Sequence, residues 1–330
     1  MANYEAIMAG FPDLFDAAII AENYLNDRYV MQPPKSQLIF DVKDITTKDE
    51  KVSSLGGYKE LDETAESGTW AQKGLVEGYD KTITPVQYTG KLSISRIMRM
   101  NDPKGAFADF NLQTRYHTTA AIYTHEKLAA SFLNGAFAST TTPDSQYLCD
   151  AAHPQSPEVT GTTYSNVLTT ALAGNGEALK AAWNHAADNL FNMAGQPIDI
   201  TNWLLVVPPA LKDVAYREVK AIYGNATTVA PTTVQSGDLY GQEINVVDWT
   251  WLSTKMGGSD TAWFLIANPV NYADVHSLRF VWRERPTFNA EGAQPYVNPE
   301  NGSFNWPVVM QCACGAIDWR HIIGSTGTGN

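Results

Sequence analysis

The chain has 330 residues, of which 44% are apolar and 18% are charged, so it can form two folded domains and disorder is not expected. Its formal net charge of −12 disfavours a conventional nucleic-acid-binding protein, because phosphates repel an acidic surface. It shows neither a signal-peptide pattern nor a run of about 18 apolar residues, which excludes a membrane helix and favours a protein made in a reducing cytoplasm.

The first 45 residues are expected to form an N-terminal arm. A short apolar stretch at 17–21 precedes the pair Pro33-Pro34, which stops a helix and favours an extended chain. The apolar residues 38–40 then predict a short strand.

Residues 46–98 predict a long two-stranded ribbon. The stretch is rich in both signs of charge and is interrupted at Gly56-Gly57. Four apolar residues partly alternate with polar ones, as in strands with one buried face: Ile83, Leu92, Ile94 and Ile97. An isolated ribbon is marginal in water. This ribbon therefore needs another surface, in its own subunit or in a neighbour.

Residues 102–135 are expected to form one long helix. Asp102 suits the N-cap, Pro103 suits the first turn, and Asn134-Gly135 supplies a stop signal. Such a helix would span on the order of 50 Å. One stripe is expected to face the core: Leu112, Tyr116, Ala120, Tyr123, Ala130 and Leu133.

The second half of the chain indicates a compact α/β subdomain. A short strand is expected near 147–149, within a connection at 136–166, and a buried strand is expected at 203–207. A further helix should follow Pro208-Pro209 and continue to about Ile222. Between the connection and the buried strand, a helix is expected at 175–194. Its apolar stripe is formed by Leu179, Trp183, Ala186, Leu190 and Met193.

The remaining residues predict a loop and several strands. Residues 224–240 are rich in Asn, Thr, Gly and Ser and predict the loop. The tail at 326–330 is small and polar and is expected to be loose. Strands are expected at 243–247, 263–267 and 279–282, with one long strand at 308–325 that is broken at Gly315.

The three cysteines are expected to be free thiols, buried or half-buried, because an odd and sparse set makes a poor disulfide framework. Cys149 and His153 are four residues apart, and Cys312 and Cys314 should lie on one face of a strand. Without a CxxC turn this set is a weak candidate for zinc, which usually takes four ligands in structural sites.

Candidate catalytic groups are also weak. His117 and His125 share a helix without the HExxH pattern, so a surface or interface position is expected. His185 and Asp188 could form a pair, but no GxSxG motif supplies a nucleophile. The carboxylates of residues 41–66 alternate with lysines and predict a solvated or intersubunit surface. The sequence therefore predicts no catalytic, cofactor-binding or metal-ligating residue, and no enzyme.

The order of these parts resembles the major capsid protein of tailed bacteriophages, and several segments resemble the Mu-like major head subunit family. These segments cover about a third of the chain. They are LCDAAHP at 148–154, the helix with Leu179 and Trp183, GQPIDITNWLLVVPPALKDVAYREV at 195–219, WFLIANP at 263–269 and CGAIDWRHIIGSTG at 314–327.

The resemblance implies an α+β protein with the tailed-phage major capsid fold. Residues 1–45 would be the N-terminal arm, and residues 46–98 the extended loop that reaches over an adjacent subunit. Residues 99–165 would form the peripheral domain with its spine helix. Residues 166–289 would form the axial domain, and residues 290–330 the C-terminal strands that return to the peripheral and axial domains.

The resemblance also implies a function. Copies would assemble as hexamers and pentamers into an icosahedral shell around double-stranded DNA, in the virion, after assembly in the cytoplasm of a bacterial host. Portal protein, maturation protease and a decoration protein would be partners. Because the chain begins almost directly with the arm, a separate scaffold is expected. No Lys–Asn cross-link is predicted.

Two alternatives remain open at this point. One is a nanocompartment shell that encloses protein cargo, and the other is a hydrolase-type enzyme with a pocket near the helix at 175–194. The shell hypothesis predicts that deleting residues 50–75 leaves the subunit soluble but stops assembly.

Overall fold

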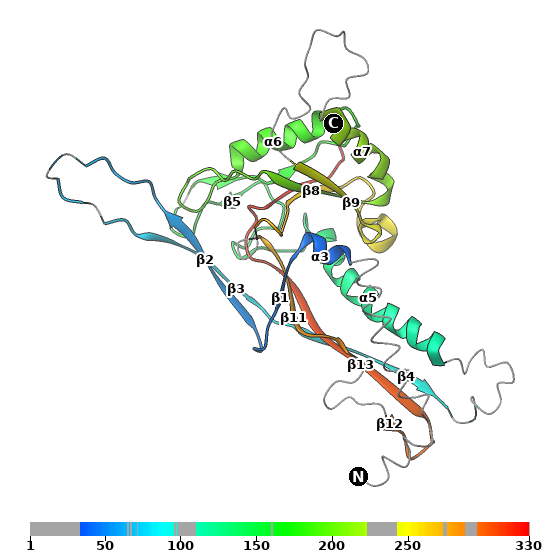
Figure 1. Cartoon of the computed structure of the whole chain (residues 1–330). Coiled ribbons are helices and arrows are strands. Elements are labelled where there is room, and N and C mark those ends of the chain that lie inside the picture. The colour runs from blue at the N-terminus through cyan, green and yellow to red at the C-terminus, as the bar shows by residue number, and fades with distance from the viewer. Residues whose placement is uncertain are drawn as a thin grey trace.

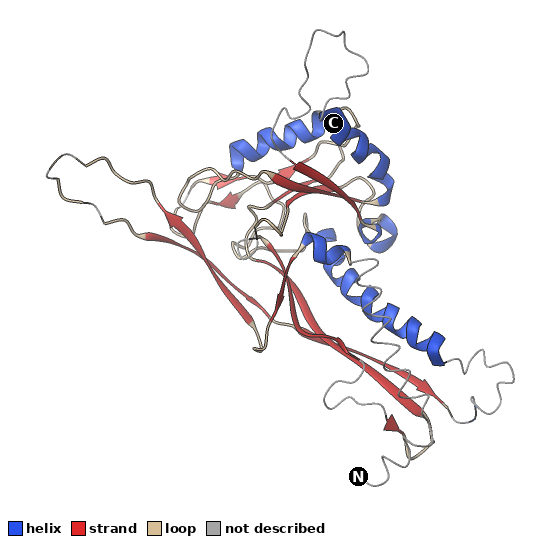
Figure 2. Cartoon of the chain, viewed as in Figure 1, coloured by secondary structure: helices blue, strands red, loops and turns tan. Residues whose placement is uncertain are grey.

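The computed structural model describes residues 34–64, 66, 68–70, 72–95, 97, 110–159, 161–222, 243–272, 276–287 and 296–329. These residues form two five-stranded sheets, a long ribbon and three principal helices (Figures 1 and 2). Three expectations fall outside the described residues: the apolar stretch at 17–21, the helix start at Asp102-Pro103 and the loop at 224–240.

The first sheet is built mainly from the C-terminal part of the chain. Its strand order is β1-β11-β13-β12, and β4 pairs with β13 as well. β1 runs parallel to β11, whereas the other pairs are antiparallel. The strands are β1 (Asp41–Asp44), β4 (Val86–Ile94), β11 (Leu278–Thr287), β12 (Tyr296–Val297) and β13 (Phe304–Ala316).

The long helix α5 (Phe110–Asn134) lies along this sheet, but it buries only part of the predicted stripe, namely Ala130 and Leu133. Tyr116 and Tyr123 are 68% and 52% exposed. Large rings of the sheet, such as Trp282, occupy the space beside the helix, so α5 presents mostly small and polar side chains to it. The buried positions of the helix include Thr114, Thr118, Ala121, His125, Ala129 and Leu133.

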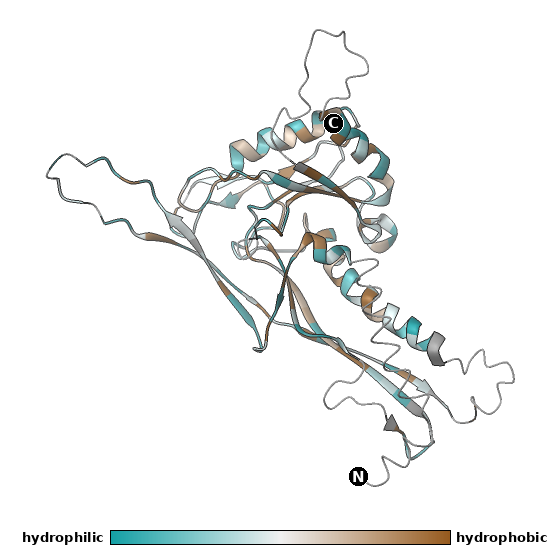
Figure 3. Cartoon of the chain, in the orientation of Figure 1, coloured by the Kyte–Doolittle hydropathy of each residue, from teal (hydrophilic) through white to brown (hydrophobic). Residues whose placement is uncertain are grey.

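The second sheet has the order β7-β14-β10-β8-β9 and is covered on both faces. Along β8, Leu205 packs in the core with helices α6 and α7, while Leu204 and Val206 pack in the core that α5 shares. Figure 3 shows apolar colour along these strands. The elements are β7 (Val167–Leu168), α6 (Glu177–Asn189), β8 (Asn202–Val207), α7 (Lys212–Ile222), β9 (Glu243–Asp248), β10 (Trp263–Ala267) and β14 (Ile322–Ser325).

Most predictions for this subdomain are confirmed: the buried strand at 203–207, the helix after Pro208-Pro209 and the strands at 243–247 and 263–267. The first of its helices is shorter than predicted and ends at Asn189. The carboxylate of Glu218 on α7 accepts backbone N–H bonds from Gly174, Asn175 and Ala178, and so caps the start of α6.

The ribbon consists of β2 (Glu50–Tyr58) and β3 (Leu75–Ile83), which pair antiparallel and project away from the two sheets (Figure 1). The predicted ribbon is therefore present. However, β4, which includes Leu92, belongs to the first sheet, where it pairs with β13 over nine residue positions. Short elements complete the described fold: α3 (Lys35–Ile39), β5 (His153–Pro154), β6 (Thr163–Tyr164), η1 (Pro209–Leu211), η2 (Thr250–Leu252) and η3 (Thr254–Met256).

Two predicted strands are wrong. Residues 35–39 form α3, and Ile39 and Phe40 enter the same core, whereas neighbours in a strand would point to opposite faces. Near residues 147–149 there is only an isolated bridge between Thr141 and Tyr147. The backbone N–H of Leu148 bonds Thr140, so these residues satisfy their polar groups without a ladder.

The C-terminal strand is also arranged differently from the prediction. Gly315 lies inside β13, and the break comes after Ala316, where the chain passes from the first sheet to the second. A Cβ atom at Gly315 would lie 2.5 Å from Ile83, so the glycine permits the close approach of the ribbon. The tail is not loose as far as Gly329, whose N–H bonds the carbonyl of Thr169 at 2.8 Å.

Among the described residues, no helix is both long enough and apolar enough to cross a bilayer.

Candidate functional site

The end of the ribbon, residues 58–75, is the most exposed apolar surface of the described chain, and we call it the ribbon tip. The side chains of Leu61 and Trp70 are 90% and 87% exposed, and Tyr58 is 59% exposed. Four exposed carboxylates accompany them: Glu60, Asp62, Glu63 and Glu66. Soluble monomers seldom expose such a group of large apolar residues, and Trp and Tyr are enriched at protein interfaces. The ribbon tip is therefore a candidate contact surface.

The base of the ribbon is held by a buried ion cluster. The guanidinium of Arg279 on β11 lies 2.8 Å from Glu50 and 3.2 Å from Asp41. These side chains are 3%, 11% and 10% exposed. Separating Glu50 from Arg279 would leave a buried charge without its partner, which is costly. The ion cluster therefore holds the start of β2 against the first sheet.

A second contact supports the ribbon from the turn that follows α6. A Cβ atom at Gly56 would lie 2.4 Å from the Cβ of Met193, and one at Gly78 would lie 2.6 Å from the Met193 sulfur. Val76 beside them is buried. The two glycines thus leave room for the Met193 side chain. This Met193 contact fixes the direction in which the ribbon projects from the two sheets.

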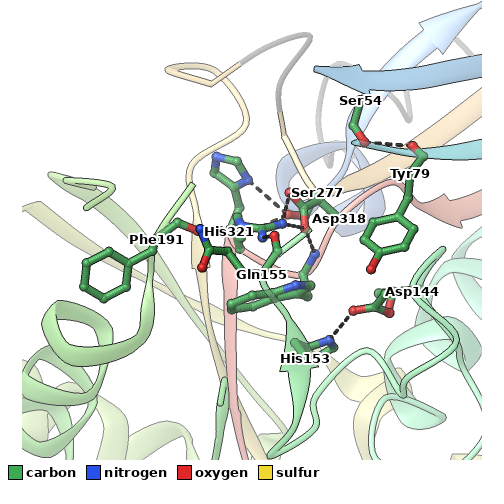
Figure 4. Close-up of polar contacts among 12 residues, drawn as sticks. Ser54, Tyr79, Asp144, His153, Gln155, Phe191, Ser277, Asp318 and His321 are labelled. Carbon is green, nitrogen blue, oxygen red and sulfur yellow. Dashed lines mark hydrogen bonds and ion pairs between the residues drawn. The ribbon is translucent and has the colours of Figure 1, made fainter. Parts of the chain in front are cut away.

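Below the ribbon lies a buried polar network (Figure 4). The Arg320 guanidinium is held by both carboxylate oxygens of Asp318, at 2.7 and 2.9 Å, and donates to the carbonyls of Gln155 and Phe191. It lies 4.7 Å from the ring centre of Trp319. The bonds to Gln155 and Phe191 join the link between β13 and β14 to two segments that are distant in the sequence.

The network includes an Asp–His pair. His153 Nδ1 lies 2.7 Å from Asp144, and its ring stacks on Trp319 at 4.6 Å. Burial acts to raise the pKa of Asp144, but hydrogen bonds from His153 and Thr142 outweigh it, and the net shift is downward. The other ring nitrogen of His153 faces Asn166 at 3.2 Å, where a catalytic pair would need a nucleophile. The pair is therefore arranged as a structural contact.

The cysteines are free, as predicted. Cys149 and Cys312 are buried and Cys314 is half-buried. Burial raises the pKa of Cys312 to about 12 and raises the pKa of the other two thiols, which disfavours the thiolate that binds metals. His153 pairs with Asp144. In the part of the chain that the structure describes, no group of three or more His, Cys, Asp or Glu residues could hold a metal ion.

The surface or interface position predicted for His125 is wrong, because the residue lies in the core of its own subunit. Its ring is fully buried, 5.3 Å from the ring of Trp282, and burial lowers its pKa to about 4. His117 is half-buried, with a pKa that burial lowers. His185 contacts Asn189, its neighbour one turn on, at 3.5 Å.

The expectation of a solvated or intersubunit carboxylate surface at 41–66 agrees with the exposed carboxylates of the ribbon tip. It is wrong for Asp41 and Glu50, which are almost fully buried and pair with Arg279 of the same chain. Glu126 was not singled out by the sequence. Its carboxylate accepts bonds from Ser36 and from the indole N–H of Trp249, and so joins α3, α5 and the second sheet. Nothing local to these residues indicates such distant partners.

Comparison with known proteins gives the family. A family model for phage capsid protein matches residues 78–324, more than half of the chain. No curated protein matches the chain in sequence.

Solved phage capsids share the fold. The capsid of cyanophage P-SCSP1u superposes with a TM-score of 0.52 and 11% identity over 88% of this chain and 86% of that one. The capsid of Myoviridae phage XM1 gives 0.51 and 13% over 89% and 90%, and the mature capsid of bacteriophage PhiM1 gives 0.50 and 8% over 88% and 86%. The chain belongs to the phage capsid protein family, and it is an α+β structural subunit of a virion shell with the tailed-phage capsid fold.

Proposed function

We propose that the chain is the major head subunit of a tailed phage of the Mu-like type, and that its copies form hexamers and pentamers in an icosahedral shell around double-stranded DNA. The observation that carries this proposal is the ribbon, which projects from the body with Leu61 and Trp70 almost fully exposed. A neighbouring copy would cover these side chains, as the large interfaces of a closed shell require.

Each region of the chain is proposed to form one part of the capsid fold. Residues 1–45 are the arm and 46–98 the extended loop, whose projecting part is β2–β3. Residues 99–165 with α5 are the peripheral domain, 166–289 the axial domain, and 290–330 the returning strands. Of the returning strands, β13 lies in the first sheet and β14 in the second, while β11, within 166–289, pairs with β13 in the first sheet.

Other parts of the proposal concern partners. A net charge of −12 suits a wall that encloses DNA without sequence-specific binding. Portal protein, a separate scaffold, a maturation protease and a decoration protein are the proposed partners, with assembly in the cytoplasm of the bacterial host. The protein-cargo nanocompartment is the alternative shell, and the contents of the particle separate the two.

The test is assembly followed by analysis of the contents. The full chain is produced alone and together with its head-gene neighbours, and particles are examined by light scattering and electron microscopy. Closed shells with six- and five-fold capsomers, holding DNA that resists nuclease until they are opened, support the proposal. Shells that hold only protein favour the nanocompartment. A persistent monomer under both conditions contradicts the proposal.

A further inference from the structure

The two sheets are connected by two neighbouring links, and each link carries a buried histidine. The link between β10 and β11 ends with His276 and Ser277, and the link between β13 and β14 ends with His321. His276 and Ser277 are fully buried, and His321 is 8% exposed. The two imidazole rings lie 5.8 Å apart, centre to centre. We call these three residues the junction, because the chain passes there twice from one sheet to the other.

Three backbone donors hold the two links together at the junction. The N–H of His321 donates to the Ser277 hydroxyl at 3.0 Å, and the N–H of Ile317 donates to the Ser277 carbonyl at 2.8 Å. The N–H of Ala267, at the end of β10, donates to the His321 carbonyl at 2.9 Å. A change in the angle between the sheets at this point would disturb all three bonds together.

The His321 side chain fits this place as a neutral ring. Its Nδ1 lies 3.0 Å from the Ser277 hydroxyl (Figure 4). Because this hydroxyl oxygen already accepts the backbone N–H of His321, its own hydrogen is available to an unprotonated Nδ1. The ring of Tyr272 lies beside the imidazole at 5.8 Å. The neutral ring is therefore satisfied by the groups around it.

His276 binds backbone groups of both sheets. Its Nε2 lies 2.8 Å from the carbonyl of Ala267 at the end of β10. Its Nδ1 lies 2.9 Å from the carbonyl and 3.1 Å from the N–H of Leu278 at the start of β11. Both ring nitrogens are thus occupied, and His276 has no polar atom left with which to stabilise a charged His321.

A proton on His321 would find no free counter-ion beside it among the described residues. Both oxygens of Asp318 bond the Arg320 guanidinium, at 2.7 and 2.9 Å. Burial, together with the neighbouring His276, lowers the pKa of His321 to about 4, so the ring is neutral at pH 7. The charged groups near His276 also pair with one another, namely Arg279 with Asp41 and Glu50.

The geometry points to the junction as a proton-sensitive latch between the two sheets, with His321 as the group that takes up the proton. Neutral His321 accepts the Ser277 hydroxyl and keeps the two links together. A protonated Nδ1 would compete with the backbone N–H of His321 for the same oxygen, and its charge gains hydration only when the links separate. A proton therefore shifts the subunit towards an open junction, in which the sheets can change their angle. The latch lies within one subunit and does not depend on the proposed shell function.

Amide hydrogen exchange of the purified full chain between pH 7 and pH 4.5 tests the latch. The probes are the amides of Ala267 and Ile317, whose bonds cross the junction, and the reference is the amide of Leu205 in β8. Rates are corrected for the exchange of an unstructured chain. Opening that takes up one proton should become about tenfold more frequent per pH unit below 6.5. Ala267 and Ile317 should therefore lose protection while Leu205 stays protected.

Substitutions at His321 separate charge from shape. The side chains in His321→Lys and His321→Met have similar length, but only the lysine is charged at pH 7. At that pH the lysine variant should exchange the two junction amides at least about tenfold faster than the methionine variant. The methionine variant should also lose the acceleration on acidification. His185→Gln is the matched control, because His185 is a half-buried histidine of α6 whose pKa burial also lowers, and it should keep the pH dependence of the unmodified chain.

Two results would overturn the latch. One is equal exchange of the junction amides and Leu205 at every pH, which would mean that acid only unfolds the whole subunit. The other is equal exchange in the lysine and methionine variants. The first comparison needs only the unmodified chain, so it decides the question even where a variant does not fold. A chain that forms no shells contradicts the proposed function and leaves the latch intact.

Discussion

The second sheet and the ribbon are both built from β-strands, but they bury their side chains in opposite ways. All residues of β8 from Trp203 to Val207 are buried, because helices cover one face and the shared core covers the other. In β3 only Val76 and Ile83 are buried, and both lie where the ribbon meets the body. The sheet is stabilised within one subunit. The ribbon is stabilised at its base and at the Met193 contact, whereas its tip is exposed, as the proposed contacts with other copies require.

The largest loss of stability is expected in the sheet. Trp263 is fully buried in β10 and its indole N–H donates to Thr170 at 2.9 Å. Trp263→Ala should lower the free energy of unfolding by about 3–5 kcal/mol, measured by denaturant titration. Trp70→Ala at the ribbon tip is the matched control and should change it by less than about 0.5 kcal/mol. Equal effects at the two tryptophans would contradict the comparison.

The ion cluster at the base of the ribbon should come next. Arg279→Met leaves Asp41 and Glu50 buried without their cation and should cost about 3 kcal/mol of unfolding free energy. Arg285 and Asp44 form an exposed pair, so Arg285→Met should cost no more than about 1 kcal/mol. A small effect at Arg279 would show that the ribbon base is not held by charge.

Acidification should weaken the packed body. Burial lowers the pKa of both His125 and His321 to about 4, from an ordinary value of 6.5. Between these two values the unfolded chain binds more protons than the folded chain, so stability falls as the pH falls from 6.5 towards 4. Each histidine contributes on the order of 3 kcal/mol over that range. Melting curves of His125→Gln and His321→Gln, recorded at several pH values, should show a stability that changes less between pH 6.5 and 4 than in the unmodified chain. An unchanged dependence of stability on pH would contradict this.

A smaller effect is expected where the ribbon meets Met193. Gly78→Ala should cost about 1–3 kcal/mol, because its methyl group would crowd the Met193 sulfur and Ser54. Gly74→Ala is the matched control on the same ribbon, since no atom lies within 4 Å of the added Cβ. Spin-label distances from the tip to the body should shift in the first variant only, and identical distances would show that Met193 does not set the direction of the ribbon.

The two regions also differ in how well the sequence predicts them. β8 and α7 follow from continuous apolar runs and helical spacing, which are local signals. The buried face of α5 was mispredicted because Tyr116 and Tyr123 look like core residues, and their exposure reflects the bulk of Phe280 and Trp282 on the sheet. The bond between Arg279 and Glu50 joins residues 229 positions apart, and no local pattern specifies it.

Shell formation after replacement of the ribbon tip tests most directly whether the ribbon joins neighbouring subunits. Tyr58 and Leu75 face each other across the ribbon, so residues 59–74 can be replaced by Asn-Gly, which favours a two-residue turn. We expect a folded subunit with nearly unchanged unfolding free energy that forms no shells by electron microscopy, under conditions where the unmodified chain does. Normal shells from this variant would contradict the claim that the ribbon tip joins one subunit to the next.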